Sequence, residues 1–235
     1  MTKDYFYEIL EIRKLVLTEN QKDQFHKFFE LLVQWNERMN LTGITDEEEV
    51  YLKHFYDSLE PFLIRGMKEF ENVCDVGTGA GFPGIPLAIV YPESKFVLID
   101  SLNKRIEFLN FCINELQLKN VVAKHVRAEE FALEKRESFD LVTSRAVAKL
   151  SILAELCAPL VKVGGMFIAL KGPSGYDELI EANDGPEKLG LRISQITPSL
   201  IKLAGERLNI YYSKAEETPK KYPRQFGQIK KNPLT

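Results

Sequence analysis

The chain has 235 residues, of which 45% are hydrophobic and 28% are charged, and its formal net charge is −3. This composition is that of a globular protein and excludes a disordered or fibrous chain. The slight acidic excess also excludes a positive field over the whole surface, so a polyanion would have to bind at a local basic patch.

Three widely spaced cysteines, Cys74, Cys112 and Cys157, predict neither a disulfide framework nor a zinc cluster. The first ten residues, MTKDYFYEIL, are unlike a secretory leader, and no apolar run is long enough to predict a membrane-spanning helix. We therefore expect a protein of a reducing, cytoplasmic compartment, with no bound metal and no membrane partner.

Residues 1–65 are predicted to be helical. Apolar residues recur there at intervals of three and four, which places on one helix face Phe25, Phe28, Phe29, Leu32, Trp35 and Met39. Asn40 and Gly43 should end this helix. Asp46 should cap the next helix, with Glu49 at the capping-box position.

Short apolar runs begin near residue 72 and alternate with helical patterns. Strands are predicted at residues 73–76, 96–99, 121–123, 139–143 and 166–170. Helices are predicted at 103–117 and 149–158, and residues 191–196 and 208–212 should form an antiparallel hairpin at one sheet edge. Strands that alternate with helices predict an α/β fold with an open, doubly wound, mostly parallel sheet.

We expect three segments: an N-terminal helical extension at 1–65, a ligand-binding α/β domain at 66–217 and a basic tail at 218–235. The tail has no acidic residue and contains five cations, Lys220, Lys221, Arg224, Lys230 and Lys231. Charge alone allows two interpretations of this tail, a frayed solvated terminus or a contact for a polyanion.

The sequence DVGTGAGFPG at residues 75–84 follows a predicted strand and opens a helix. Glycines such as Gly77, Gly79 and Gly81 allow the backbone to approach a ligand closely or to adopt positive φ. Gly79, Gly81 and Gly84 also match the dinucleotide fingerprint GxGxxG, so an NAD-dependent oxidoreductase is one interpretation of the loop.

Asp75 favours S-adenosylmethionine as the cofactor instead. An acid at this position would repel a pyrophosphate, whereas it would attract the ammonium and sulfonium groups of S-adenosylmethionine. Asp100, at the end of the second strand, could accept hydrogen bonds from the ribose of either cofactor, or could cap the following helix.

Ala128 and Glu129 follow the third strand. They should lie near the adenine, because ligands of doubly wound sheets bind beyond the carboxyl ends of the strands. The alternative for Glu129 is a solvated acid beside Glu130.

Ser144, Arg145 and Ala146 end the fourth strand, where a methyl-transfer site would be built. We predict that Arg145 positions the cofactor or the substrate. The Asn/Asp-Pro-Pro-Tyr/Phe segment usual in enzymes that methylate exocyclic amines is absent here, and no cysteine is placed as the nucleophile for C5 of cytosine. The remaining targets are already nucleophilic, such as N7 of guanine, and need alignment but no general base.

Several short segments together carry a resemblance to a known family. In chain order they are WNERMNLT at 35–42, HFYDS at 54–58, the loop at 75–84, DSLNKR at 100–105, SRA at 144–146, KG at 171–172, and YPR at 222–224 with Gly227. In this combination, and over nearly its whole length, the chain closely resembles the bacterial ribosomal RNA small-subunit methyltransferase G family, also called the glucose-inhibited division protein B family.

The resemblance implies a class I methyltransferase fold of Rossmann-like type, with an N-terminal helical extension and S-adenosylmethionine as cofactor. It implies methylation of N7 of one guanine in a 16S rRNA hairpin, with that base extruded into the crevice. By motif position, the cofactor contacts of the family fall on Gly77, Phe82, Ala128, Glu129 and Arg145.

The resemblance also implies that the stretch from Asn40 to Ser58 faces the crevice. Asn40, His54 and Asp57 then become candidate substrate contacts, although for His54 and Asp57 a polar pair on a surface helix is the simpler interpretation. Lys171 and Arg224 are candidate phosphate contacts. Phe82 could pack against the cofactor or cap the core.

Two alternatives to a methyltransferase remain open from the residues. An oxidoreductase is disfavoured by Asp75 and by the absence of a Tyr-x-x-x-Lys proton relay after the fourth strand. A protein that binds cofactor and RNA without turnover is also compatible with the sequence. The chemistry needs no general base, so there is no catalytic residue whose absence would reveal such a protein. We expect small-subunit rRNA, free or in an assembling particle, as the partner, and a monomer, since the sequence has no exposed heptad.

Overall fold

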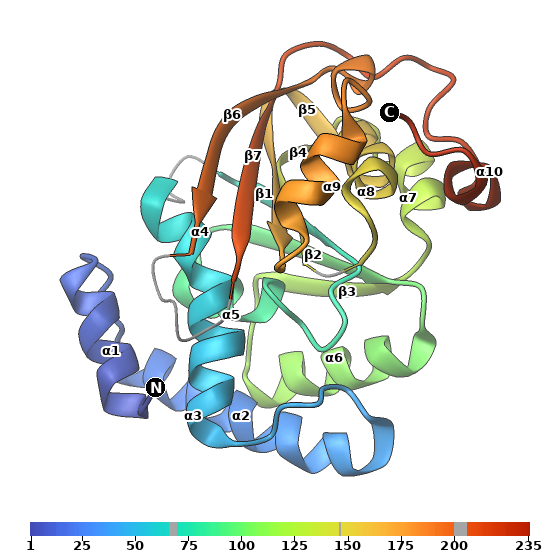
Figure 1. The fold of residues 1–235 in the computed structure, drawn as a ribbon. Helices are drawn as coiled ribbons and strands as arrows, with labels where there is room; N and C mark the ends of the chain where they lie inside the picture. Colours follow the sequence, from blue (N-terminus) through green and yellow to red (C-terminus); the bar gives the residue numbers. More distant parts are fainter. Residues whose placement is uncertain (66–69, 146, 200–205) are drawn as a thin grey trace.

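The computed structural model describes residues 1–65, 70–145, 147–199 and 206–235. One sheet has the strand order β3-β2-β1-β4-β5-β7-β6 (Figure 1). The strands are β1 Asn72–Val76, β2 Lys95–Asp100, β3 Val121–His125, β4 Phe139–Arg145, β5 Val161–Lys171, β6 Leu191–Pro198 and β7 Leu208–Lys214. Strands β1 to β5 are parallel, and β7 runs antiparallel to both of its neighbours, β5 and β6. The predicted doubly wound fold with an antiparallel edge is thereby confirmed.

Helices flank both faces of the sheet. The α-helices are α1 Lys3–Ile12, α2 Glu19–Met39, α3 Glu47–Val50, α4 Asp57–Arg65, α5 Gly84–Val90, α6 Asn103–Glu115, α7 Ala128–Glu134, α8 Leu150–Cys157, α9 Gly175–Ala182 and α10 Phe226–Lys231. The π-helix η1 Tyr51–Tyr56 joins α3 to α4, and two 3-10 turns are η2 Ala158–Leu160 and η3 Glu187–Leu189. No helix of the described residues is long and apolar enough to cross a membrane.

Capping residues set the bounds of the N-terminal helices. Thr18 and Gln21 form a reciprocal capping box at the start of α2. Asn40 ends α2 in the left-handed conformation with φ of 49°, and Asp46 accepts the Glu49 amide at the start of α3. The predicted ends of these two helices are therefore confirmed.

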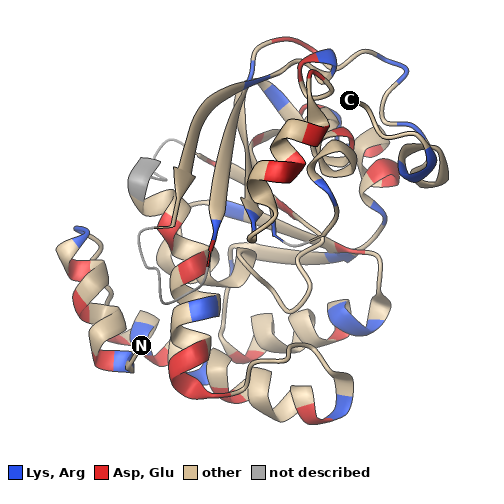
Figure 2. Cartoon of the chain, viewed as in Figure 1, with Lys and Arg blue, Asp and Glu red and all other residues tan. Residues whose placement is uncertain are grey.

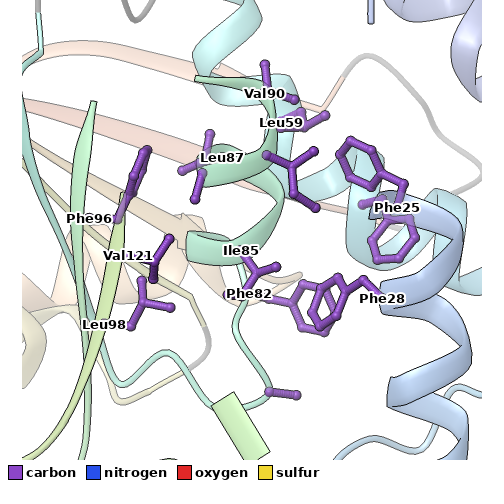
Figure 3. Packing of buried hydrophobic residues seen from close by; sticks show 14 of the residues in the cluster. Phe25, Phe28, Leu59, Phe82, Ile85, Leu87, Val90, Phe96, Leu98 and Val121 are labelled. Atoms are coloured by element: carbon purple, nitrogen blue, oxygen red, sulfur yellow. The ribbon is translucent and has the colours of Figure 1, made fainter. Parts of the chain in front are cut away.

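Residues of opposite parity on each strand pack into two hydrophobic clusters, one on each side of the sheet. On β1, Val73 joins the cluster formed with α1, α2, α4, α5 and α6, and Cys74 joins the cluster formed with α7 and α8. In Figure 3, Phe82 and the α5 side chains lie between Phe25 and Phe28 of α2 and the sheet. The N-terminal helices thus share a core with the sheet and are held against the carboxyl end of β1.

Some sequence expectations were wrong in detail. The strand expected at 166–170 is longer, because β5 begins at Val161 and passes through Gly164, whose φ is +84°. The helix expected at 149–158 does stop before Pro159, since α8 ends at Cys157, but a separate 3-10 turn, Ala158–Leu160, follows it directly. The tail is not frayed, since Ile229 in α10 is buried and Arg224 is paired with buried Glu155.

Candidate active site

The glycine loop after β1 is fixed by backbone hydrogen bonds to the end of β2. The amides of Gly77 and Thr78 both donate to the Ile99 carbonyl oxygen, at 2.9 and 3.1 Å. Gly77, Gly79 and Gly81 all have positive φ, at +68°, +62° and +94°. A Cβ at Gly79 would meet nothing within 4 Å, whereas a Cβ at Gly77 would meet Val147 at 2.3 Å. The turn therefore requires glycine for its conformation, and Gly79 faces open space.

Asp75 lies beneath this loop and is fully buried. Its Oδ2 accepts the Gly84 amide at 2.9 Å, at the start of α5, while its Oδ1 has no hydrogen-bond partner among the described residues. Burial raises the pKa of Asp75 to about 7, because the charged carboxylate is poorly solvated. Asp75 thus holds the loop in place, and its predicted attraction for the cofactor's cationic groups stays a prediction.

The carboxylate of Asp100 accepts hydrogen bonds both from the glycine loop and from the start of the following helix. Its Oδ2 accepts the Gly79 amide and the Arg105 Nη1, each at 3.0 Å, and its Oδ1 accepts the Leu102 amide at 2.9 Å. The interpretation of Asp100 as the N-cap of α6 is wrong, because Leu102 occupies that position. Asp100 instead lines a cavity at the carboxyl ends of the strands.

This cavity, called here the first cavity, has a volume of about 390 Å³. Residues that line it include Gly77, Asp100, Arg105, Ala128, Glu129 and Phe226. Ala128 and Glu129 begin α7, and Arg127 forms an ion pair with Glu129 at 2.6 Å. Four predicted cofactor residues, Gly77, Asp100, Ala128 and Glu129, therefore meet around one space.

The first cavity fits an adenosine-containing cofactor. A buried carboxylate at the end of β2 suits ribose hydroxyls, and the backbone at Ala128 suits an adenine edge. Gly79 leaves open space where a side chain would otherwise project. The described residues contain no cluster of His, Cys, Asp and Glu that could hold a metal ion.

A second cavity, of about 250 Å³, lies on the other side of the end of β4. It is lined by Lys53, His54, Asp57, Arg145, Lys171 and Arg207, among others. Val147 lines the first cavity and Arg145 lines the second, so the two spaces adjoin the same strand end. Ala146, the residue between Arg145 and Val147 in the sequence, lies outside the described residues.

Arg145 is the centre of the polar contacts in the second cavity. Its Nη1 is 3.0 Å from Asp57 Oδ2 and 3.2 Å from the Lys53 carbonyl oxygen, and its guanidinium lies 4.8 Å from the centroid of the Phe82 ring. Burial lowers the pKa of Arg145 and the Asp57 carboxylate opposes this shift, so the guanidinium keeps its charge. The predicted positioning residue is thus rigidly oriented.

His54 is stacked on Phe82, with ring centroids 4.6 Å apart. Burial, followed by the Arg145 guanidinium, lowers the pKa of His54 to about 3. Three groups lie within hydrogen-bond distance of the ring: Nε2 is 2.8 Å from Thr42 Oγ1, and Nδ1 is 3.1 Å from the Lys53 carbonyl oxygen and 3.3 Å from Arg145 Nη2. His54 is therefore neutral at physiological pH.

The neutrality of His54 predicts a pH-dependent stability. Its folded pKa is lower than its unfolded pKa of about 6.5, so only the unfolded chain binds this proton between pH 3 and 6.5, and stability rises with pH through that window. When the pH falls from 7 to 5, the free energy of unfolding, measured with urea, should decrease by roughly 2 kcal/mol more in the wild type than in His54→Gln. Equal losses in the two proteins would show that His54 titrates normally.

The other predicted site residues differ in whether they line a cavity and in which partners they already contact. Phe82 packs against Phe28, with ring centroids 5.4 Å apart, and is not among the residues that line the first cavity. Lys171 lines the second cavity, but its ammonium is 2.6 Å from Glu178. Arg224 is paired with Glu155, and Asn40 is exposed at the end of α2. Their contacts with cofactor or RNA stay predictions.

Sequence reasoning missed several residues that line these cavities, among them Arg207 and Phe226. Arg207 donates from Nε to Asp57 Oδ1 at 3.2 Å and completes the second cavity. Phe226, in the tail, lines the first cavity. Each is brought to the site by tertiary packing, and no local motif marked either one.

Comparison with known proteins gives the family. The model of the rRNA small subunit methyltransferase G family matches residues 21–207. The chain belongs to this family. The proteins named ribosomal RNA small subunit methyltransferase G from Staphylococcus aureus (strain Newman) and Staphylococcus carnosus (strain TM300) are each 51% identical to it, over 100% of this chain and 99% of theirs.

Solved structures share the fold of this family member at low sequence identity. A SAM-dependent methyltransferase from Aquifex aeolicus has a TM-score of 0.55 and 21% identity, covering 74% of this chain and 96% of its own. A SAM-dependent O-methyltransferase from Thermotoga maritima has a TM-score of 0.55 and 16% identity, covering 80% of this chain and 73% of its own.

Membership of the family confirms the resemblance seen in the sequence. The chain is an rRNA methyltransferase of S-adenosylmethionine-dependent type, as predicted, and the oxidoreductase interpretation of the glycine loop is wrong. The GxGxxG match was misleading because the same tight turn serves both cofactors.

Proposed function

We propose that this methyltransferase binds S-adenosylmethionine in the first cavity and transfers its methyl group to N7 of a guanine of 16S rRNA held in the second cavity. The observation that carries the proposal is the position of the two cavities, which adjoin the end of β4 at Val147 and Arg145. A base in the second cavity and a cofactor in the first could therefore meet at one strand end.

The residues of the second cavity suit alignment of a base better than proton transfer. The cofactor, when bound, supplies an electrophilic methyl group on a sulfonium. Guanine N7 carries an in-plane lone pair and loses no proton, so no general base is required. Neutral His54 and permanently charged Arg145 offer fixed hydrogen-bond donors, and Asp57 holds both Arg145 and Arg207 in place.

The substrate is proposed to reach the second cavity as an extruded base. A cavity of about 250 Å³ is of a size to admit one base but not a duplex. Around it, Lys53 and Arg207 are candidate phosphate contacts in addition to the predicted Lys171. Lys and Arg are interspersed with acids over the ribbon before the tail (Figure 2), and Arg224 of the tail is paired with Glu155, so RNA affinity should come from this local group.

We further propose that the chain acts as a monomer in the cytoplasm, where rRNA is its partner, either free or in an assembling particle. The division into an extension at 1–65, a methyltransferase domain at 66–217 and a tail at 218–235 also stays a proposal. The shared hydrophobic cluster favours the first two segments folding together.

Arg207 provides a test of the second cavity. Arg207→Ala should lower kcat/KM for RNA about tenfold, because one cationic contact is lost, while the cofactor dissociation constant is unchanged. The matched control is Arg192→Ala, which removes an exposed arginine paired with Glu216 near the opposite end of the sheet. A loss of turnover in both variants, or in neither, would contradict the assignment of the second cavity to RNA.

The proposed function itself is tested by methyl transfer to RNA. Purified protein is mixed with labelled S-adenosylmethionine and with small-subunit rRNA that lacks the modification, either naked or as ribosomal particles. Incorporation of label into either RNA supports the proposal and identifies the form that is recognised. Cofactor binding without incorporation into either form would contradict it.

A further inference from the structure

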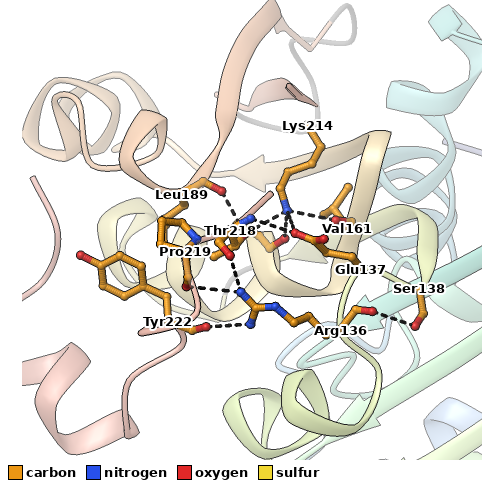
Figure 4. Close-up of polar contacts among 10 residues, drawn as sticks. Arg136, Glu137, Ser138, Val161, Leu189, Lys214, Thr218, Pro219 and Tyr222 are labelled. Carbon is orange, nitrogen blue, oxygen red and sulfur yellow. Dashed lines mark hydrogen bonds and ion pairs between the residues drawn. The ribbon is translucent and has the colours of Figure 1, made fainter. Parts of the chain in front are cut away.

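The C-terminal tail is fixed to the methyltransferase body at its beginning. Arg136 donates to the backbone carbonyl oxygens of Thr218 and Tyr222, and the Thr218 amide donates to Glu137 at 2.8 Å (Figure 4). Buried Lys214 donates to Thr218 Oγ1 at 2.9 Å. These contacts set where the tail leaves β7.

A second anchor holds the tail at Arg224, two residues after Tyr222. The Arg224 guanidinium donates to the carboxylate of fully buried Glu155 from Nε, at 2.9 and 3.2 Å, and from Nη2, at 2.6 Å, and its backbone amide donates to the same carboxylate. Ile229 is also fully buried, and α10 contacts α8. Phe226 lies between Arg224 and Ile229, both of which are held against the body, so its ring has little freedom to leave.

The Phe226 ring lines the end of the first cavity where Ala128 and Glu129 begin α7. The Arg127 guanidinium lies 4.8 Å from the centroid of this ring, and Arg127 also pairs with Glu129. Leu156 of α8 lines the same cavity. An aromatic ring, a planar guanidinium and an apolar side chain therefore border one end of the space, which suits the flat face of a purine.

We propose that Phe226, together with Arg127, forms the outer wall of the adenosine part of the cofactor site, so that the tail is a component of that site. The proposal rests on the first cavity being the S-adenosylmethionine site. It gives the fixed position of the tail a purpose other than phosphate binding. It also places a cofactor-binding residue outside residues 21–207, the part of the chain that the family model matches.

The test is calorimetric titration with S-adenosylhomocysteine, which needs neither RNA nor turnover. Phe226→Ala should raise the dissociation constant on the order of tenfold, since the wall loses its aromatic face. Phe226→Tyr keeps the ring and should retain nearly the wild-type constant. Gln228→Ala changes an exposed side chain on the same helix and serves as the matched control.

A second readout uses the wild-type protein alone. Added S-adenosylhomocysteine should slow hydrogen exchange at the amides of α10, because a ligand against Phe226 restrains the tail. The proposal is overturned if Phe226→Ala binds within twofold of wild type and α10 exchange does not respond. Failure of wild type itself to bind S-adenosylhomocysteine would instead contradict the proposed cofactor site.

Discussion

Replacing Arg145 with alanine should reduce kcat/KM for RNA methylation by at least about 100-fold. Arg145 is a largely buried cation that lines the second cavity, and its guanidinium contacts Asp57, His54 and Phe82. Without it, a base in the second cavity would lose the group that orients it. Asp57 would keep its pair with Arg207, so the protein should remain folded and should still bind cofactor.

The companion variant Arg145→Lys separates orientation from charge. Lysine keeps the positive charge but cannot reproduce the planar fork that reaches Asp57 and the Lys53 carbonyl oxygen together. We expect it to restore stability, measured by urea unfolding, more than turnover, measured with labelled RNA. Wild-type turnover in Arg145→Ala would remove Arg145 from the active site.

Replacing Gly79 with phenylalanine should abolish measurable cofactor binding, which corresponds to a rise of about 100-fold or more in the dissociation constant. Gly79 has φ of +62°, and a side chain there would project into open space at the carboxyl ends of the strands. We predict that this space is needed by the cofactor. Binding of S-adenosylhomocysteine, measured by calorimetry, reports the effect without RNA.

The control for Gly79→Phe is Gly164→Phe. Gly164 also has positive φ, +84°, and a Cβ there also meets nothing within 4 Å. It lies near the start of β5, at the end of the sheet opposite the glycine loop. Both variants should carry a similar cost from strained backbone, but only Gly79→Phe should lose the cofactor. Loss of binding in both would point to a general loss of structure.

Local patterns were sufficient to predict most of the sheet and part of the site. The strands β1 to β4 are short apolar runs, and ligand-facing residues follow them directly, as Gly77 follows β1 and Ala128 follows β3. The carboxyl ends of parallel strands lie at one edge of the sheet. A residue that follows such a strand in the sequence can therefore be placed at that edge without the structure. Asp100 was found for this reason.

The remaining features depend on contacts between distant segments. Arg207 meets Asp57 across 150 residues of sequence, and no local spacing marks that pair. Phe226 lies in a segment whose composition drew attention to charge, so its aromatic ring was overlooked. The π-helix at Tyr51–Tyr56, which brings His54 onto Phe82, has no periodicity that distinguishes it from an α-helix.

The central claim is tested most directly by identifying the methylated nucleoside. After reaction with labelled S-adenosylmethionine, one portion of the under-methylated small-subunit rRNA is digested to nucleosides to identify the labelled product, and a second portion is cut into oligonucleotides to locate the label in the sequence. We predict label in 7-methylguanosine alone, at one site in 16S rRNA. Label in another nucleoside would contradict the proposed target. Tight cofactor binding with no label in RNA or in ribosomal particles would show instead a cofactor-binding RNA module without turnover.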